Sequence, residues 1–444
     1  MRIRRPLIAV TAALLAVPAV ALAAPKSNPA PKFAPPVTLS GFSGGEPSVA
    51  FDPSGNGWVY VDAPQSIPSV VDNQQRGVGL WASHDGARHF APGINVGSYV
   101  GGGDSDVEVG IDHTVYIADL ELIGSAICRS SDNAKTFESP GVPAPDSCDG
   151  AVADQQGPVA DREWLTHGPK GELYLTYHDP HVELPYVYRS DDRAQTFVPC
   201  GSVFDPTGNA LQNFTPGPTS GTQVPKPVVG PDGTLYVPVA AAAPVDSTVG
   251  FSSLYVEIAE GGCTPATATF VEHTIYQHSG ADLANPFDGL AIDGGGVLYL
   301  VATGKTTADE KYPATWLFTS TDNGVHWGKP VKVSPPAQHT ALLPAVAGGL
   351  RRGQVAVGWY GATEGGDLRY YVATSTDAGK HFSVSATTKA ACHSGTGISR
   401  GVAGDFSSIA VEPRTGAVVA VYGADPSGKG VVWVNRQTGG RFLR

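Results

Sequence analysis

The feature that most constrains the fold of this chain is a short pattern that returns along it. The pattern is S-x-D-x-(G/A)-x-x-(F/W), and five clear copies carry the aspartates Asp85, Asp132, Asp192, Asp322 and Asp377. These aspartates are separated by 47, 60, 130 and 55 residues, and 130 is two steps of 65, which places one lost or blurred copy near residue 257. A repeat of this length is typical of a propeller or a solenoid, in which each repeat is one supersecondary unit.

A second unit lies between the copies: a short apolar strand, a tight turn and another strand. Val, Ile, Tyr and Leu runs separated by Gly-containing turns predict antiparallel hairpins. Seven such hairpins occur, at residues 46–61, 106–118, 161–176, 226–237, 288–301, 344–358 and 406–421. With one strand entering each patterned turn and one leaving it, every unit has four strands, which is the make-up of a propeller blade. We therefore predict an all-β propeller of seven four-stranded antiparallel blades, with six as the alternative if the fourth or seventh unit is vestigial.

The two ends of the chain bear on how the ring closes. After Phe442 only two residues remain, too few for an outer strand of the last blade, whereas residues 37–40 precede the first hairpin and have no partner. We expect this N-terminal strand to complete the last blade and so to cover a sheet edge that would otherwise invite aggregation.

Composition and the N-terminal residues indicate an exported protein. Residues 1–23 place arginines before an apolar run that ends in Ala-Leu-Ala, the layout of a cleaved signal peptide, and residues 24–36 form a Pro-rich leader. Residues 37–444 are then a single propeller domain. The formal net charge is −12, and it becomes more negative once the leader arginines are removed. Such an acidic chain is a poor partner for nucleic acid or anionic lipid, and the apolar run is too short for a membrane span. The sequence gives no indication of the oligomeric state.

The repeated pattern resembles the Asp-box, or bacterial neuraminidase repeat, of the sialidase-like propeller superfamily. Its residues suit a stapled turn, because the Asp carboxylate can accept backbone N–H groups, the Ser hydroxyl can tie the loop ends and Gly permits positive φ. Three copies have Ala at the Gly position, so those turns must differ or carry strain. In the family such turns lie away from the active site, so the pattern predicts the fold rather than the chemistry.

Chemistry is expected where the innermost strands begin, because these starts converge on the mouth of the central funnel. The positions that we select at or near this mouth are acidic, aromatic or basic: Glu46, Asp106, Asp161, Arg162, Glu163, Tyr177, His178, Asp179, Asp288, Trp359, Tyr360 and Asp405. Paired carboxyl groups are what most glycosidic cleavage requires, one as proton donor and one as nucleophile or base. We assign Asp161, Glu163 and Tyr177 as candidate catalytic residues and the others as candidate substrate-binding residues. Alternation along a strand places Asp161 and Glu163 on one face and Arg162 on the other.

Two of these assignments have structural alternatives. Arg162 can instead pair with a carboxylate of a neighbouring blade and lock the ring, and the aromatic residues Trp359 and Tyr360 can instead pack between blades.

The resemblance implies sialidase chemistry only in part. That chemistry needs three arginines, an early Arg-Ile-Pro motif, an Asp acid and a Tyr nucleophile assisted by Glu, but here the first hairpin opens with Glu46-Pro47. An acidic funnel would also repel the carboxylate of a sialic acid. We expect no cofactor and no metal, since Asp104, Asp106 and Glu108 are interpreted as a metal-free acidic turn in preference to a Ca²⁺ site.

Five cysteines in an exported chain predict disulfides with one thiol left over. We expect the pairs Cys128–Cys148 and Cys200–Cys263, with Cys392 free. The leading functional hypothesis is a secreted, glycoside hydrolase-like propeller that acts on a glycan. The alternative is a non-catalytic propeller that binds a glycan or a protein loop in the same funnel.

Overall fold

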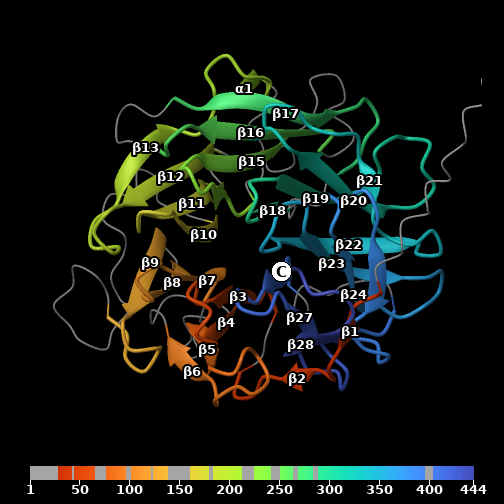
Figure 1. The fold of residues 1–444 in the computed structure, drawn as a ribbon, viewed down its shortest axis with the longest axis horizontal. Helices are drawn as coiled ribbons and strands as arrows, with labels where there is room; N and C mark the ends of the chain where they lie inside the picture. The colour runs from red at the N-terminus through yellow and green to blue at the C-terminus, as the bar shows by residue number, and fades with distance from the viewer. Residues whose placement is uncertain are drawn as a thin grey trace, which may run out of the picture.

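Seven antiparallel sheets surround one central axis (Figure 1). The computed structural model describes residues 29–42, 45–65, 77–96, 102–121, 124–138, 161–179, 184–212, 225–241, 251–263, 269–283, 289–395 and 404–444. Each sheet is one blade, and the blades follow one another around the ring in chain order. The seven-bladed propeller predicted from the sequence is confirmed, and the six-bladed alternative is excluded.

The strands of each blade run from the axis outward in chain order. Blades 1 to 3 contain β3 (Ser48–Phe51), β4 (Val59–Pro64), β5 (Val78–Ser83) and β6 (Ile94–Val96); β7 (Ser105–Val109), β8 (Val115–Glu121) and β9 (Gly124–Ser130); and β10 (Asp161–His167), β11 (Leu173–Asp179), β12 (Leu184–Ser190) and β13 (Val198–Ser202). Blades 4 and 5 contain β14 (Val228–Val229), β15 (Leu235–Ala241), β16 (Ser253–Ala259) and β17 (Val271–Gln277); and β18 (Gly289–Ile292), β19 (Leu298–Gly304), β20 (Ala314–Ser320) and β21 (Val331–Lys332). Blades 6 and 7 contain β22 (Thr340–Gly348), β23 (Val355–Ala362), β24 (Arg369–Ser375) and β25 (Ser383–Ala386); and β26 (Ser408–Val411), β27 (Val418–Ala424) and β28 (Val431–Gly439). One short helix, α1 (Asn209–Gln212), follows β13 within the described ranges.

The N-terminal strands close the ring, as predicted. Both β1 (Lys32–Phe33) and β2 (Val37–Thr38) pair antiparallel with β28 and take the outer position of blade 7. In Figure 1 these first strands lie beside the last strand of the chain. Pairing therefore begins inside the segment 24–36 that we expected to be a leader.

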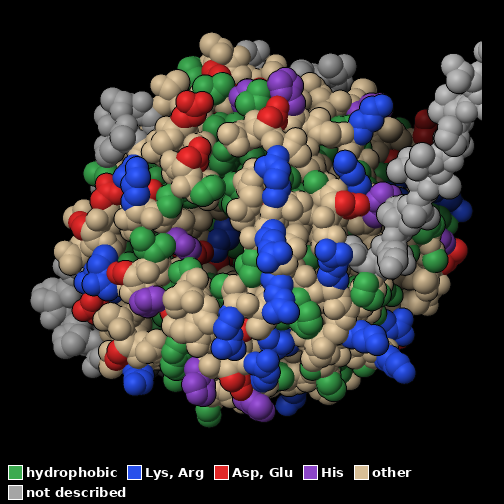
Figure 2. Space-filling model, viewed as in Figure 1, with side chains coloured by type: hydrophobic (Ala, Val, Ile, Leu, Met, Phe, Trp, Pro, Cys, Tyr) green, Lys and Arg blue, Asp and Glu red, His purple; other side chains and the backbone are tan. Residues whose placement is uncertain are grey.

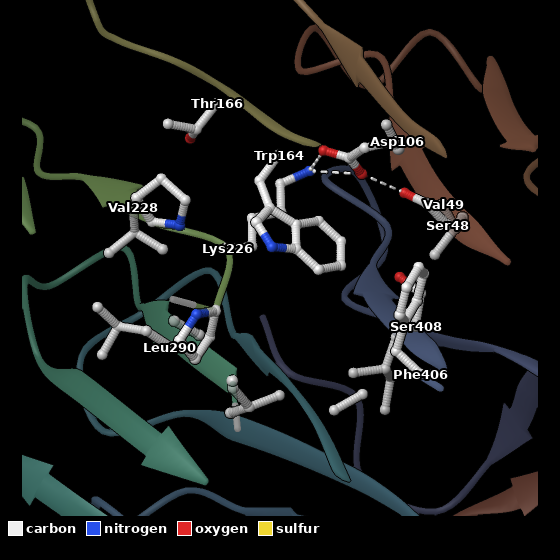
Figure 3. A pocket seen from close by; sticks show the side chains of 18 of the residues that line it. Ser48, Val49, Asp106, Trp164, Thr166, Lys226, Val228, Leu290, Phe406 and Ser408 are labelled. Carbon is white, nitrogen blue, oxygen red and sulfur yellow. Dashed lines mark hydrogen bonds and ion pairs between the residues drawn. The ribbon is translucent and has the colours of Figure 1, made fainter. Parts of the chain in front are cut away.

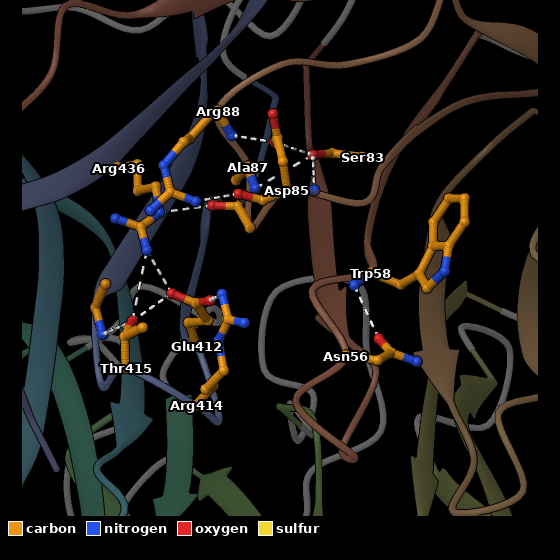
Figure 4. Close-up of polar contacts among 12 residues, drawn as sticks. Asn56, Trp58, Ser83, Asp85, Ala87, Arg88, Glu412, Arg414, Thr415 and Arg436 are labelled. Atoms are coloured by element: carbon orange, nitrogen blue, oxygen red, sulfur yellow. Dashed lines mark hydrogen bonds and ion pairs between the residues drawn. The ribbon is translucent and has the colours of Figure 1, made fainter.

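The five patterned turns share one hydrogen-bond arrangement, and we call them box turns. In each, the Ser hydroxyl donates to the Asp carboxylate two residues later, at 2.8 to 2.9 Å. The same hydroxyl accepts the backbone N–H four residues later, and the carboxylate accepts the N–H of the residue four after it. Figure 4 shows this arrangement in blade 1, between Ser83, Asp85 and Ala87. The local geometry that the pattern predicted is present in all five turns.

A second polar network joins blade 7 to blade 1. The Arg436 guanidinium donates to the Gly86 carbonyl at 2.6 Å and pairs with the Glu412 carboxylate (Figure 4). Because Gly86 belongs to the first box turn, this arginine fastens the last blade to the first.

The hydrophobic core is divided among the contacts between blades. Each of the seven pairs of neighbouring blades shares one cluster of buried side chains, such as Val59 and Val419 between blades 1 and 7. Since no blade buries both faces by itself, the sheets stabilise one another around the ring.

The cysteines agree with the sequence-based assignment where they are described. Cys200 and Cys263 form a disulfide between blades 3 and 4, and Cys263 follows the β16–β17 turn, where the box pattern is lost. Cys128 is also disulfide-bonded, and its expected partner Cys148 lies outside the described residues. Cys392 is free and buried, and burial raises the pKa of its thiol to about 12. Within the described ranges, no helix is long and apolar enough to cross a membrane.

Candidate functional site

The innermost strands of all seven blades line a central channel with a cavity of about 410 Å³. The lining is unevenly polar. Blades 2 and 3, with Lys226 of blade 4, contribute the charged side chains, whereas blades 5 and 6 contribute apolar side chains such as Leu290 and Val346. In the close-up of Figure 3, the Trp164 indole lies beside Lys226. Its ring centroid is 5.0 Å from that of Phe406 in an edge-to-face contact.

A charged network occupies the polar side of the channel. The Lys226 ammonium lies 2.8 Å from Asp106 and 3.1 Å from Glu108, and the Ser48 hydroxyl donates to Asp106 at 2.5 Å. The His167 imidazole lies 2.7 Å from Glu108. Burial alone would raise the pKa of Glu108, but Lys226 and His167 hold it at about 2. This network joins four blades, and its carboxylates are satisfied by cations and hydroxyls of the chain itself.

A second cluster, which we call the acid mouth, lies where the innermost strands begin. It consists of Glu46, Asp104, Asp161, Arg162, Glu163 and Asp405, contributed by blades 1, 2, 3 and 7. The Arg162 guanidinium lies 4.0 Å from Asp161 and 3.9 Å from Asp405. The Glu46 carboxylate accepts the N–H of Asp405 at 2.7 Å, and Asp104 accepts the N–H of Arg162 at 3.2 Å. Five carboxyl groups are thus gathered near one guanidinium.

Burial and mutual repulsion favour the protonated form of several of these carboxyls. Burial, with the neighbouring charge of Asp405, raises the pKa of Glu46, and burial, with the charge of Glu46, raises that of Asp104 well above its usual range. Burial also raises the pKa of Glu163. Asp161 and Asp405 are the more open carboxylates, with side chains 33% and 29% exposed. The acid mouth therefore combines buried proton-holding acids with accessible carboxyl groups.

A β-bulge sets the direction of each side chain at the start of β10. The register against β11 shifts between Asp161 and Trp164, and Arg162 has a φ of 60°. The regular alternation that the sequence predicts for residues 161–163 is interrupted there. Arg162 lines the channel, whereas Glu163 is 1% exposed and accepts a hydrogen bond from Ser125 of blade 2 at 3.0 Å. Bulges of this kind redirect side chains and are frequent beside functional sites.

Several predicted site residues lie away from the acid mouth. Tyr177 is 3% exposed, and its hydroxyl donates to that of Tyr188 at 3.3 Å within the packing between blades 2 and 3. Trp359 donates its indole N–H to Gln338 at 2.8 Å, and Tyr360 donates its hydroxyl to the Gly423 carbonyl at 2.9 Å; both are fully buried, so they pack within and between blades. Asp106 belongs to the charged network of the channel.

The side chains of three other predicted site residues are not described by the structure. Asp288 lies outside the described residues. His178 and Asp179 are placed only by the backbone of β11, where His178 is the register partner of Asp161.

Other residues of the channel and mouth were not among the selected ones. Asp104 precedes β7, and Trp164 and His167 lie on β10, downstream of Asp161. The alternating acids Asp104, Asp106 and Glu108 were a usable signal, but we interpreted them as a metal-free acidic turn and selected only Asp106 among them. Within the described ranges, no group of three or more His, Cys, Asp or Glu side chains has the geometry to hold a metal ion.

The comparisons with known proteins identify the fold. No protein-family model matches the chain, and no curated protein sequence matches it. A polysaccharide lyase of family PL25, an ulvan lyase solved with a saccharide of glucuronic acid and sulfated rhamnose, has a TM-score of 0.56 and 11% identity and covers 90% of this chain and 95% of its own. The polysaccharide lyase Uly1 has a TM-score of 0.52 and 10% identity, with 94% of each chain covered.

A sialidase is also similar, more distantly. The intramolecular trans-sialidase from Ruminococcus gnavus has a TM-score of 0.44 and 13% identity and covers 94% of this chain and 98% of its own. At these identities, the similarity to the two lyases shows the propeller fold alone, and not an activity.

Proposed function

We propose that this protein acts on a glycan at the acid mouth and cleaves a glycosidic bond by general acid–base catalysis. The observation that carries the proposal is the convergence of five carboxyl groups and one guanidinium, from four blades, at the entrance of the channel. Glycosidic cleavage needs one carboxyl that holds a proton and one that is ionised. The raised pKa values of Glu46 and Asp104 meet the first need.

The roles follow from exposure. Asp161 is an accessible carboxyl group and takes the role of base or nucleophile, as proposed from the sequence, and Glu46 is the proton donor. Arg162, 15% exposed, orients the substrate through hydroxyl or carboxylate groups. Glu163 is too buried to touch a sugar, and its hydrogen bond from Ser125 gives it a structural role behind the bulge. Tyr177 is also too buried to touch a sugar, and we assign it a packing role between blades 2 and 3.

A polysaccharide lyase is the second candidate, because Arg162 lies among acids that favour their protonated forms. Eliminative cleavage of a uronate chain requires that the carboxylate of the sugar be neutralised and that a base remove the proton beside it. Arg162 with protonated Asp104 supplies the first group, and Asp161 supplies the base. The bond from the next carbon to the glycosidic oxygen then breaks, and Glu46 donates the proton that the leaving oxygen takes up. The propeller that is similar at a TM-score of 0.56 is itself a polysaccharide lyase.

The two reactions give different products. A panel of aryl glycosides, neutral polysaccharides and polyuronates is incubated with the protein while reducing ends and the ultraviolet absorbance of unsaturated uronides are followed. Hydrolysis produces new reducing ends without the ultraviolet absorbance, whereas elimination produces new reducing ends together with that absorbance. Asp161→Asn and Glu46→Gln are expected to lower kcat by about 100-fold or more. Glu364→Gln is the matched control, because Glu364 is 79% exposed and remote in sequence from the acid mouth.

Two outcomes would remove the proposal. Turnover unaffected by both mouth substitutions would place the chemistry elsewhere. Glycan binding without turnover would favour the non-catalytic propeller. Secretion is part of the proposal and is supported by the leader sequence and the disulfide between Cys200 and Cys263.

A further inference from the structure

A band of basic side chains crosses the face of the propeller seen in Figure 2, beside the central hollow. Each innermost strand begins at the acid mouth and ends in a hairpin turn, so the hairpin turns form the opposite face of the ring. Exposed arginines occupy two of these turns and the C-terminal segment. They are Arg351 and Arg352 in the β22–β23 turn, Arg414 in the β26–β27 turn, and Arg441 and Arg444.

Backbone hydrogen bonds hold these segments side by side. The N–H of Leu350 donates to the carbonyl of Leu443 at 3.0 Å, and the N–H of Leu443 donates to the carbonyl of Gly416 at 2.8 Å. At the other end, Arg352 reaches blade 5, where its guanidinium donates to the Gly295 carbonyl at 2.7 Å. The arginines therefore form one continuous surface from blade 5 to blade 7, which we call the arginine band.

The positive character of the band arises because the acids of the same turns are turned inward. Asp293 is 3% exposed and accepts backbone N–H groups of Gly295 and Gly353. Glu412 is 1% exposed and pairs with the buried Arg436. Arg414, in contrast, is 63% exposed and lies 4.0 Å from Glu412. Within these two hairpin turns, local charge thus runs opposite to the formal net charge of −12 for the whole chain.

We propose that the arginine band is a binding surface for an anionic polysaccharide, separate from the acid mouth. A guanidinium presents paired N–H donors that match a carboxylate or a sulfate, and a band built from arginine suits repeated anionic groups along a chain. The inference does not depend on catalysis at the acid mouth.

Two other polyanions fit the band less well. Duplex DNA carries about one charge per 1.7 Å of axis, so a chain with a net charge of −12 is repelled by it more strongly than by a polymer with one charge per sugar. A lipid surface would be expected to engage apolar side chains as well. The exposed large apolar residues of the described ranges are Ile94, Ile111, Val198, Val271 and Val325, and none belongs to the band segments.

The test measures binding of alginate, which carries carboxylates, and of dextran sulfate, with neutral dextran as the uncharged probe. The variant is Arg351→Gln, Arg352→Gln, Arg414→Gln and Arg441→Gln combined. The matched control removes the same charge at four exposed lysines outside the band, by Lys135→Gln, Lys170→Gln, Lys389→Gln and Lys429→Gln. Circular dichroism checks that both fold.

We expect the wild-type protein to bind at least one of the charged polymers and not dextran. The arginine variant should bind about 30-fold more weakly, while the lysine control changes by less than about 3-fold. Loss of this binding in the arginine variant, with the turnover number at the acid mouth retained, separates the band from the acid mouth.

Three results would overturn the proposal. They are absence of binding to both charged polymers at low salt, an equal loss in the lysine control, and tighter binding of a duplex DNA or of phosphatidylglycerol vesicles than of either polysaccharide.

Discussion

At the residue scale, the most consequential single charge is the Lys226 ammonium in the channel. It neutralises Asp106, which is fully buried, and Glu108, and its own side chain is 32% exposed. Lys226→Met would leave two carboxylates near each other without their cation. Breaking a fully buried pair costs about 3–5 kcal/mol, and the partial exposure here lowers the expected loss to about 2 kcal/mol.

The free energy of unfolding from urea titration measures this loss. Lys389→Met, at an exposed lysine, is the control and should change stability by less than about 0.5 kcal/mol. Equal stability of the two variants would mean that the ion pairs contribute nothing to the ring.

A second residue, Glu257 on β16, should make stability depend on pH. Its side chain is 0% exposed, it accepts the N–H of Asp205 at 3.2 Å, and the nearby acids are Asp205 and Glu272. Burial raises its pKa from 4.5 to about 8. Because the folded state holds the proton more tightly, stability falls as pH rises from about 4.5 to about 8, by no more than about 5 kcal/mol. Below that window both states are protonated and the effect disappears.

Glu257→Gln removes this titration while keeping the shape of the side chain. Urea denaturation at pH 5 and pH 8 should therefore show a smaller decline for the variant than for the wild type. Parallel declines in both proteins would refute the assignment.

At the element scale, each box turn has one position with a left-handed backbone, and this position is occupied by Ala in three turns and by Gly in two. Ala87, Ala134 and Ala194 have φ values of 66°, 63° and 62°, so they carry the strain that the sequence predicted for these copies. Gly379 has a φ of 76°, and a Cβ there would lie 2.5 Å from Leu317 Cδ2. Gly379→Ala should therefore combine a backbone cost of about 1 kcal/mol with a steric cost of about 1–2 kcal/mol.

Gly365 supplies the comparison that isolates the steric part. Its φ is 66°, and a Cβ would meet nothing within 4 Å. Thermal or urea denaturation should show Gly379→Ala to be clearly less stable than Gly365→Ala. If the two variants are equal, the contact with Leu317 is irrelevant to the turn.

The elements were predictable because their signals are local. Hairpin chemistry and the box pattern specify turns within a few residues, and the seven repeats then leave few arrangements that bury every sheet. The same locality explains what was missed. The bulge at Arg162 and the burial of Glu163 against Ser125 depend on blade 2, which adjacent residues in the sequence do not report.

At the scale of the whole molecule, the place where the selected rim residues meet could be foreseen, whereas their roles stay a proposal. Strand starts meet at one mouth in a propeller, and Glu46, Asp161 and Asp405 lie around Arg162 there. Trp359 and Tyr360 lie within β23, the second strand of blade 6, and their side chains pack against neighbouring sheets and not into the channel. Lys226 stands at a strand start of the rim but was not selected as a site residue, and its partners Asp106 and Glu108 belong to blade 2, two units earlier in the sequence.

Ring closure is the property that only the complete molecule has. The outer position of blade 7 is filled by β1 and β2, Leu39 is 2% exposed, and the Trp81 indole donates to the Ser40 carbonyl at 2.7 Å. A chain that starts at Gly41 would lose these contacts and leave β28 as an open edge. Loss of the Leu39 burial and of several backbone hydrogen bonds should lower the free energy of unfolding by at least about 3 kcal/mol.

The open edge should also promote association, since an unpaired strand is a template for another chain. Size-exclusion chromatography at increasing concentration would reveal it, with a chain that starts at Pro29 as the control because it keeps both strands. A monomeric chain from Gly41 with the stability of the control would show that the ring holds without its N-terminal strands. In that case the contact between Arg436 and the Gly86 carbonyl would have to fasten blade 7 to blade 1 unaided.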